Sequence, residues 1–142
     1  MTQIAAHRGG AILWPENSLL AFRNALALPV EQLELDVHAS AEGEPVVIHD
    51  ATLDRTTEGT GPVVAHGLAA LRATRLRGTA GEGVPTLAEA AALVAAAGRI
   101  LRLEIKADAE GRPYPGLTAR SAAVLDAAGM RPRTVLMSFQ PA

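Results

Sequence analysis

Short apolar segments of strand-like composition alternate along this chain with segments of helical periodicity. A strand presents its side chains alternately on two faces, whereas apolar residues three and four positions apart share one face of a helix. The alternation predicts an α/β fold with a parallel sheet, because each helix can return the chain to the end of the sheet where the next strand starts. The expected strands are residues 4–7, 33–37, 46–49, 101–106 and 135–139.

Sequence signals for helix ends accompany most of the helical segments. Pro15 precedes the first segment, and Asn17 or Ser18 is expected to cap it. Thr86 and Glu89 have the spacing of a capping box, and the two longest later segments each stop at a glycine. The expected helices are residues 17–28, 68–76, 86–97 and 118–128, and the turn-rich segment 51–63 is expected to be a structured loop.

The link between the second and third expected strands is too short for an ordinary crossover. Only eight residues separate Val37 from Val46, whereas a connection between parallel strands normally takes about a dozen or more. The link is either an extended return without a helix or the turn of a hairpin, and the sequence leaves both open.

Composition limits the class of protein. The chain has 142 residues, 49% of them hydrophobic, which suits a single domain over residues 1–142. A net charge of −2 and scattered basic residues give no reason to expect nucleic-acid binding. Because there is neither a signal-peptide pattern nor an apolar run of about 18 residues, we expect no membrane span and a cytoplasmic location. Without cysteine, any metal must be held by oxygen or imidazole ligands.

Polar residues lie at or near the C-terminal ends of the expected strands. They are His7, Asp36, His49, Glu104 and Lys106. In parallel α/β folds this edge binds ligands and gathers catalytic groups. A lone histidine that ends a strand is usually structural or solvated, but five such residues are hard to explain by core packing, because buried charges need partners.

Three acids favour a divalent-cation site. Glu34 and Asp36 are two residues apart, which places both on one face of a strand, where they repel unless a cation lies between them. Glu104 adds a third carboxylate, and such ligands suit Mg²⁺ or Ca²⁺, between which the sequence does not decide. The alternative, that Glu34 and Asp36 are ordinary surface acids, fits poorly with the apolar residues that alternate with them.

His7 and His49 suit general acid/base catalysis, because imidazole can give or take a proton near neutral pH. Hydrolysis of a phosphodiester needs both actions, one on the attacking oxygen and one on the leaving alcohol. Arg8 and Lys106 would neutralise the phosphate oxygens. The pattern therefore predicts metal-assisted phosphodiester hydrolysis, and it leaves open which histidine is the acid and which the base.

Other polar residues are expected to be structural. Asn17 is expected to cap its helix or, alternatively, to touch the site. Arg55 is expected to pair with Asp54 or Glu58 rather than to contact phosphate. His38 is expected on the strand face opposite the two acids, outside catalysis.

The order of these residues resembles the motif pattern of the glycerophosphodiester phosphodiesterase family, from about residue 4 to residue 106. A run of linked motifs this long is far more specific than a single short pattern. The matching segments are His7-Arg8-Gly9-Gly10, Pro15-Glu16-Asn17-Ser18, Glu34-Leu35-Asp36-Val37, Pro45-Val46-Val47-Ile48-His49-Asp50, Leu53-Asp54-Arg55-Thr56-Thr57, Val84-Pro85-Thr86-Leu87-Ala88-Glu89 and Leu103-Glu104-Ile105-Lys106.

The resemblance implies a TIM (β/α)8 barrel of the phospholipase-C-like phosphodiesterase type, with the second and third strands joined without a full helix. It implies one divalent cation, Mg²⁺ or Ca²⁺, and a small-molecule glycerophosphodiester substrate that is split into an alcohol and sn-glycerol 3-phosphate. The implied residue roles fall on Glu34, Asp36 and Glu104 as cation ligands, His7 and His49 as the acid/base pair, and Arg8 and Lys106 as phosphate contacts.

Length is where the chain departs from the family. A TIM barrel takes about 250 residues, so we expect about the first five strands here and a barrel truncated at its C-terminal side. Two alternatives to an active hydrolase follow: an inactive fragment or half-barrel that acts through assembly, and another phosphodiesterase of the same barrel type. The sequence decides neither the oligomeric state nor the preferred alcohol head group.

Overall fold

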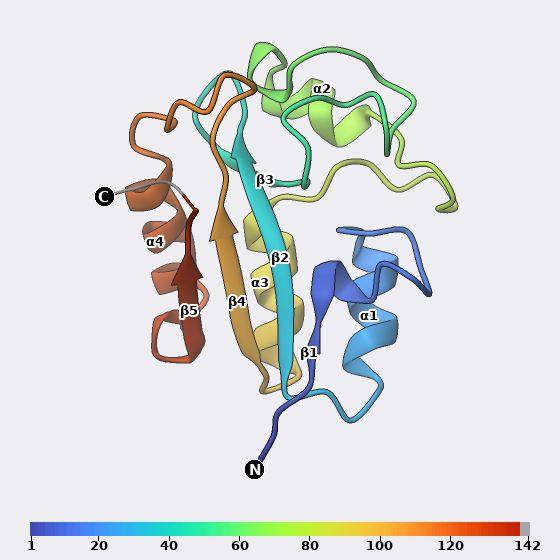
Figure 1. Ribbon diagram of the computed structural model, residues 1–142, viewed down its shortest axis with the longest axis vertical. Helices are drawn as coiled ribbons and strands as arrows, with labels where there is room; N and C mark the ends of the chain where they lie inside the picture. The colour runs from blue at the N-terminus through green and yellow to red at the C-terminus, as the bar shows by residue number, and fades with distance from the viewer. Residues whose placement is uncertain (140–142) are drawn as a thin grey trace.

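The computed structural model describes residues 1–139 and has a five-stranded sheet at its centre (Figure 1). Four strands run parallel in the order β1-β2-β4-β5, and β3 pairs with β2 off this path. The α/β class with a parallel sheet is therefore confirmed. The strands are β1 (Ala5–Ala6), β2 (Gln32–Ala39), β3 (Pro45–Val47), β4 (Ile100–Ile105) and β5 (Thr134–Met137).

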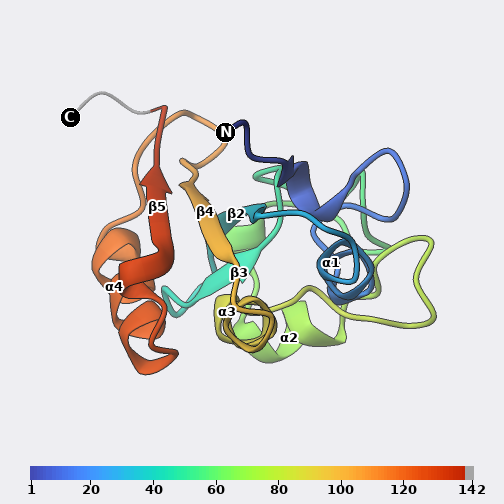
Figure 2. The ribbon, with the colours of Figure 1, turned by 90° about the horizontal axis from the view of Figure 1, so that it is seen from below.

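Helices cover one side of the curved sheet, with α1, α3 and α4 following its outer face (Figure 2). The expected helices are confirmed, although the second ends three residues early. Ser18, not Asn17, caps the first helix, with its hydroxyl accepting the Ala21 N–H. The helices are α1 (Leu19–Leu26), α2 (Leu68–Ala73), α3 (Leu87–Ala96) and α4 (Leu117–Ala127). Three short 3-10 turns lie in the connections: η1 (His7–Gly9), η2 (Val63–Ala65) and η3 (Arg131–Arg133).

The two faces of β2 and β4 have opposite chemistry. Leu33 and Leu35 of β2 lie in register with Leu101 and Leu103 of β4, and all four are fully buried in the core formed with the helices. Burying each leucine contributes about 1.5–3 kcal/mol. The alternate positions of both strands carry the acids, so the alternation that packs the core also places the acids together on the other face.

The short link forms a hairpin. β3 runs antiparallel to β2, with Val47 opposite Val37, and Gly43 in the turn has a φ of 85°. The expected third strand ends at Val47 rather than at residue 49. Because β3 runs against its neighbours, the rule about the ends of parallel strands does not account for the position of His49. Its position follows from the hairpin, which returns the chain along β2 as far as Ile48, whose N–H donates to the Asp36 carbonyl at 3.1 Å.

A second, smaller core supports the structured loop expected over residues 51–63. The Thr57 hydroxyl donates to the Leu53 carbonyl at 2.7 Å and closes the loop from within. This core is formed by Val46, Ile48, Leu53, Val63, Leu71, Leu76 and Val84.

We predict that Thr86→Ala destabilises the fold by about 1 kcal/mol, because it removes the N-cap of α3. The Thr86 hydroxyl accepts the Glu89 N–H at 3.2 Å, and the Glu89 carboxylate accepts the Thr86 N–H at 2.9 Å. Urea denaturation measures the change. Thr118→Ala, at an exposed threonine of α4, is the matched control and should change stability by less than about 0.5 kcal/mol. Equal effects of the two substitutions would contradict the capping role.

Candidate metal and catalytic site

Three buried carboxylates meet where β2 and β4 lie side by side (Figure 1). Asp36 stands directly opposite Glu104 in the parallel register, and Glu34 is one strand repeat away. Each offers an oxygen within 4.8 Å of the others, and the residues are 7%, 1% and 8% exposed for Glu34, Asp36 and Glu104. We call these three residues the acid cluster. Their burial rules out the alternative of ordinary surface acids.

The acid cluster fits a hard cation. Within the described residues the buried Asp36 Oδ1 accepts no hydrogen bond, and it forms an ion pair with the Lys106 Nζ at 3.4 Å. A buried carboxylate oxygen without a hydrogen bond is costly unless a cation compensates it. Oxygen ligands of this kind are those that Mg²⁺ and Ca²⁺ take. Glu34, Asp36 and Glu104 therefore form a candidate divalent-metal site.

The pKa of Glu34 shows the electrostatic effect of this arrangement. Burial raises the pKa of its carboxyl, and the negative charge of Asp36 raises it further. The backbone N–H of Arg8 opposes the shift by donating to Glu34 Oε2 at 2.8 Å. A cation bound here would favour the ionised carboxylate.

Two basic side chains partly compensate the acids. Lys106 Nζ donates to Glu104 Oε1 at 2.7 Å, and Arg8 Nε lies 3.7 Å from Asp36 Oδ2. With every acid ionised, these two cations leave one net negative charge. Both predicted phosphate-binding residues therefore lie against the acid cluster.

His7 lies beside the acids in a tight turn. β1 ends at Ala6, so the expected strand 4–7 is shorter than predicted, and His7 opens the turn η1, in which Arg8 has a φ of 49°. The His7 Nε2 is 3.9 Å from Glu34 Oε2, and its side chain is 68% exposed. Gly9 is required because a Cβ there would lie 2.7 Å from the Phe22 ring. The turn thus presents His7 to solvent next to the acid cluster.

His49 is held by its neighbour Asp50. The His49 Nδ1 donates to Asp50 Oδ1 at 2.8 Å, so Nε2 is the ring nitrogen that does not face Asp50. Among the described residues no hydrogen bond or ion pair joins the His49 side chain to the acid cluster. The structure therefore brings together Glu34, Asp36, Glu104, Arg8, Lys106 and His7, and it joins His49 to them through the backbone of β2 and β3.

Arg55 links the two histidine-bearing segments, and its expected pairing with Asp54 or Glu58 is wrong. Its guanidinium donates to both Asp50 oxygens at 2.7 and 2.8 Å and to Glu16 Oε1 at 2.7 Å. These hydrogen bonds hold the pKa of Asp50 well below its usual range. Arg8 Nη1 reaches Glu16 at 3.4 Å, so an ion-pair network runs from Arg8 through Glu16, Arg55 and Asp50 to His49. We call these five residues the Arg55 network.

Two residues near the site were assigned other roles from the sequence. Asn17 is 2% exposed and donates through Nδ2 to Asp36 Oδ2 at 3.0 Å, so it touches the site, and its expected role as the helix cap is wrong because Ser18 takes that place. His38 lies on the same face as the acids, because β2 continues to Ala39 and positions 34, 36 and 38 share one face. The expected opposite face is wrong. The two-residue spacing was itself the signal for His38, whereas nothing local marks Asn17.

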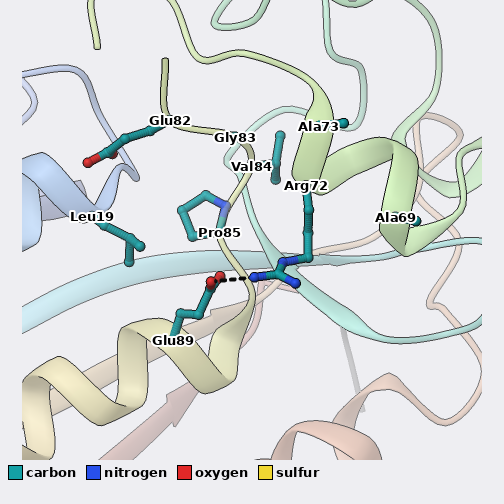
Figure 3. Close-up of a pocket in the computed structure, with 9 residues that line it drawn as sticks. All are labelled: Leu19, Ala69, Arg72, Ala73, Glu82, Gly83, Val84, Pro85 and Glu89. Atoms are coloured by element: carbon teal, nitrogen blue, oxygen red, sulfur yellow. Dashed lines mark hydrogen bonds and ion pairs between the residues drawn. The ribbon is translucent and has the colours of Figure 1, made fainter. Parts of the chain in front are cut away.

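The pocket drawn in Figure 3 lies elsewhere. It has a volume of about 440 Å³, and none of its lining residues belongs to the predicted site. Its charged side chains are already paired, with Arg72 donating to Glu89 at 2.8 Å. Within residues 1–139, none of the helices combines the length and apolar character that crossing a membrane requires.

Comparison with known proteins identifies relatives along nearly the whole chain. Residues 7–142 match the Glycerophosphoryl diester phosphodiesterase family. A glycerophosphodiester phosphodiesterase from Caldanaerobacter subterraneus subsp. tengcongensis is 34% identical over 143 residues, which cover 97% of this chain and 58% of that protein. The chain thus spans less than two thirds of the length of this relative.

Solved structures agree with the sequence comparison. A crystal structure from Agrobacterium tumefaciens superposes with a TM-score of 0.94 at 38% identity, covering 99% of this chain and 57% of that chain. A phosphodiesterase from Oleispira antarctica, solved in complex with its product sn-glycerol-3-phosphate, gives a TM-score of 0.86 at 32% identity and covers 99% and 58%. The superpositions confirm the expected barrel type, and the chain corresponds to part of that barrel.

We predict that Mg²⁺ or Ca²⁺ stabilises the fold, by about 2.7 kcal/mol at a concentration of 100 times its Kd. Glu34→Gln should abolish this shift. It should also raise the stability of the metal-free protein, because the raised pKa of Glu34 means that its ionised form disfavours the folded state at neutral pH. Thermal unfolding with and without cation measures both effects, and Glu58→Gln, at an exposed acid, is the control.

The stabilisation of the fold by the cation should depend on pH. Folded Glu34 holds its proton more tightly than the unfolded chain does, so the destabilisation is present above the raised pKa and is relieved as pH falls through it. Protons then compete with the cation, and the metal-induced increase in Tm should shrink over that range. A metal-induced increase in Tm that stays the same as the pH is lowered from neutral through the acid range in which the protein remains folded would contradict this.

Proposed function

The chain belongs to the glycerophosphoryl diester phosphodiesterase family, and we propose that its site hydrolyses glycerophosphodiesters to an alcohol and sn-glycerol 3-phosphate. The observation that carries the proposal is the buried acid cluster with Arg8, Lys106 and His7 packed against it. Phosphodiester hydrolysis requires these elements together: a cation site, positive charge for phosphate and a proton-transfer group.

The acid cluster would hold one divalent cation, Mg²⁺ or Ca²⁺, which when bound supplies Lewis-acid polarisation of a phosphoryl oxygen. Charge balance supports a phosphate ligand at this place. The cluster with Arg8 and Lys106 carries one net negative charge when all acids are ionised, and one net positive charge once a divalent cation is counted. A phosphodiester monoanion matches that charge.

Arg8 and Lys106 would orient the diester. Both already lie against Asp36, at 3.7 and 3.4 Å, so their positions are set before substrate binds. Such preorganised positive groups stabilise charge that builds up on phosphoryl oxygens without moving during the reaction. Asn17, by donating to Asp36, keeps that carboxylate turned toward the acid cluster.

His7 and His49 would carry the two proton transfers. One takes a proton from the attacking oxygen as its bond to phosphorus forms, and the other gives a proton to the alcohol oxygen as its bond to phosphorus breaks. His49 is prepared for this because its Nδ1 is occupied by Asp50 and its Nε2 is left available. His7 is prepared by its exposure beside Glu34.

The substrate class comes from the relatives. The Caldanaerobacter protein is named a glycerophosphodiester phosphodiesterase, and the Oleispira structure holds sn-glycerol-3-phosphate as its product. Both names fit the positive charge that a bound cation would give the acid cluster here. The proposed product is therefore sn-glycerol 3-phosphate.

The exposure of β5 favours a second proposal. In this proposal the site acts only within a larger assembly. Val135 and Leu136 of the edge strand β5 are 43% and 47% exposed, so this edge of the sheet leaves apolar side chains uncovered. Further barrel strands, from any source, would cover them. Native mass measured alongside activity separates the two proposals, because activity in a 14.7 kDa monomer would rule out the need for assembly.

We predict that the chain releases choline and sn-glycerol 3-phosphate from glycerophosphocholine, and that a chelator stops the reaction. His7→Ala and His49→Ala should each lower kcat by about 10²–10⁴-fold, the usual contribution of a proton-transfer group. His66→Ala, at a histidine whose ring is bonded to the Pro62 carbonyl, should leave kcat unchanged. Hydrolysis that survives both the chelator and His7→Ala would overturn the proposal.

A further inference from the structure

The backbone at His49 lies just beyond the regular pairing of the hairpin. β3 ends at Val47, and among the described residues the bond from the Ile48 N–H to the Asp36 carbonyl is the last backbone–backbone hydrogen bond between this segment and β2. The carbonyl of His49 is therefore not held by a backbone N–H of the β2–β3 ladder. A side chain takes that place.

That side chain is His38, which is 2% exposed. Its Nε2 lies 2.9 Å from the His49 carbonyl oxygen. A carbonyl oxygen only accepts, so Nε2 carries the proton and donates it. With the proton on Nε2, Nδ1 is the ring nitrogen that can accept a hydrogen bond.

The acceptor is occupied by Tyr114. Its hydroxyl lies 2.8 Å from His38 Nδ1, and the two rings meet edge to face with centroids 5.7 Å apart. Burial raises the pKa of Tyr114 to about 12, so the hydroxyl keeps its proton and donates it. Donor and acceptor are thus defined at both ends of the His38 ring.

Tyr114 is itself held in place. It follows a short loop between β4 and α4 that is closed by a bridge between Ala107 and Pro113. The Asp108 carboxylate tightens this loop by accepting the backbone N–H groups of Glu110 and Arg112, at 3.0 and 2.8 Å. The loop after β4 therefore reaches across the ends of the strands to a residue of β2.

We propose that Tyr114 and His38 are positioning residues for His49, through a directed pair of hydrogen bonds from the Tyr114 hydroxyl to His38 and from His38 to the His49 carbonyl. The inference rests on the proposed function for the catalytic part of His49. Asp50 fixes the ring of His49 and His38 fixes its backbone, so the two contacts together determine where the free Nε2 points.

Loss of the Tyr114 or His38 hydrogen bond should lower kcat rather than weaken substrate binding. A proton-transfer group displaced by about 1 Å can lose on the order of 10²-fold in rate. Neither Tyr114 nor His38 shares a hydrogen bond with the proposed phosphate-binding residues within the described part of the chain. Substrate affinity should therefore be little affected.

The test compares Tyr114→Phe, His38→Leu and His38→Gln in the full chain with its divalent cation. Tyr114→Phe keeps the ring and loses the hydroxyl, and we expect kcat to fall by about tenfold, the equivalent of one hydrogen bond. His38→Leu should lower kcat by about 100-fold, and His38→Gln, which keeps an N–H donor at a similar reach, should recover part of the loss. KM should change by less than about twofold in each variant.

The matched control is Thr134→Val on β5. It removes a hydroxyl that donates to the Met130 carbonyl at 2.8 Å. It also loses one hydrogen bond from a side chain, but without a link to His49. A fall in kcat for Tyr114→Phe no larger than for Thr134→Val would overturn the proposal, and so would a loss that appears in KM alone.

A second readout separates this inference from the proposed function. Nitrogen-15 NMR of the histidine rings reports the tautomer of His38 and the environment of His49 without any turnover. We expect His38 to carry its proton on Nε2, and the His49 ring signals to shift in both His38→Leu and Tyr114→Phe but not in Thr134→Val. Unchanged His49 signals in a folded Tyr114→Phe protein would refute the positioning role. A wild-type chain that hydrolyses nothing would instead refute the proposed function.

Discussion

The repulsion among three buried carboxylates is the constraint on which the rest of this site depends. The register of β2 and β4 places Asp36 opposite Glu104, and the strand repeat adds Glu34. Removing such charges from water costs several kcal/mol each unless they are compensated. Lys106 and Arg8 each contact two of these acids, Asn17 contacts one, and the three residues come from separate segments. The neighbouring segments thus bring compensating groups to the acid cluster.

Much of the fold and of the acid cluster could be predicted because it depends on local periodicity. Alternation in residues 33–37 fixes which side chains enter the core and which face away, whatever the strand pairs with. The Thr86 capping box is equally local. The family motifs then supply the roles of residues that no periodicity could assign, and those roles for His7, His49, Arg8 and Lys106 stay predictions.

What the sequence could not supply depends on contacts between distant segments. Arg55 bonds Glu16, 39 residues earlier, and no local pattern distinguishes that partner from the nearby Asp54. Asn17 meets Asp36 across 19 residues for the same reason. The error over His38 has a different origin, because the spacing of 34, 36 and 38 already placed it on the acid face once the strand was known to reach Ala39.

The Arg55 network has a consequence for how this chain can change over time. Arg8, Glu16, Arg55 and Asp50 alternate in charge. With His49 they come from the opening turn, the residues before α1, the end of the hairpin and the loop that follows it. A substitution that removes the charge of Arg55 would leave both of its acidic partners without their shared ion pair. The segments are separate in the sequence, but their ion pairs make each charge depend on the others. We therefore expect substitutions in the Arg55 network to occur together rather than one at a time.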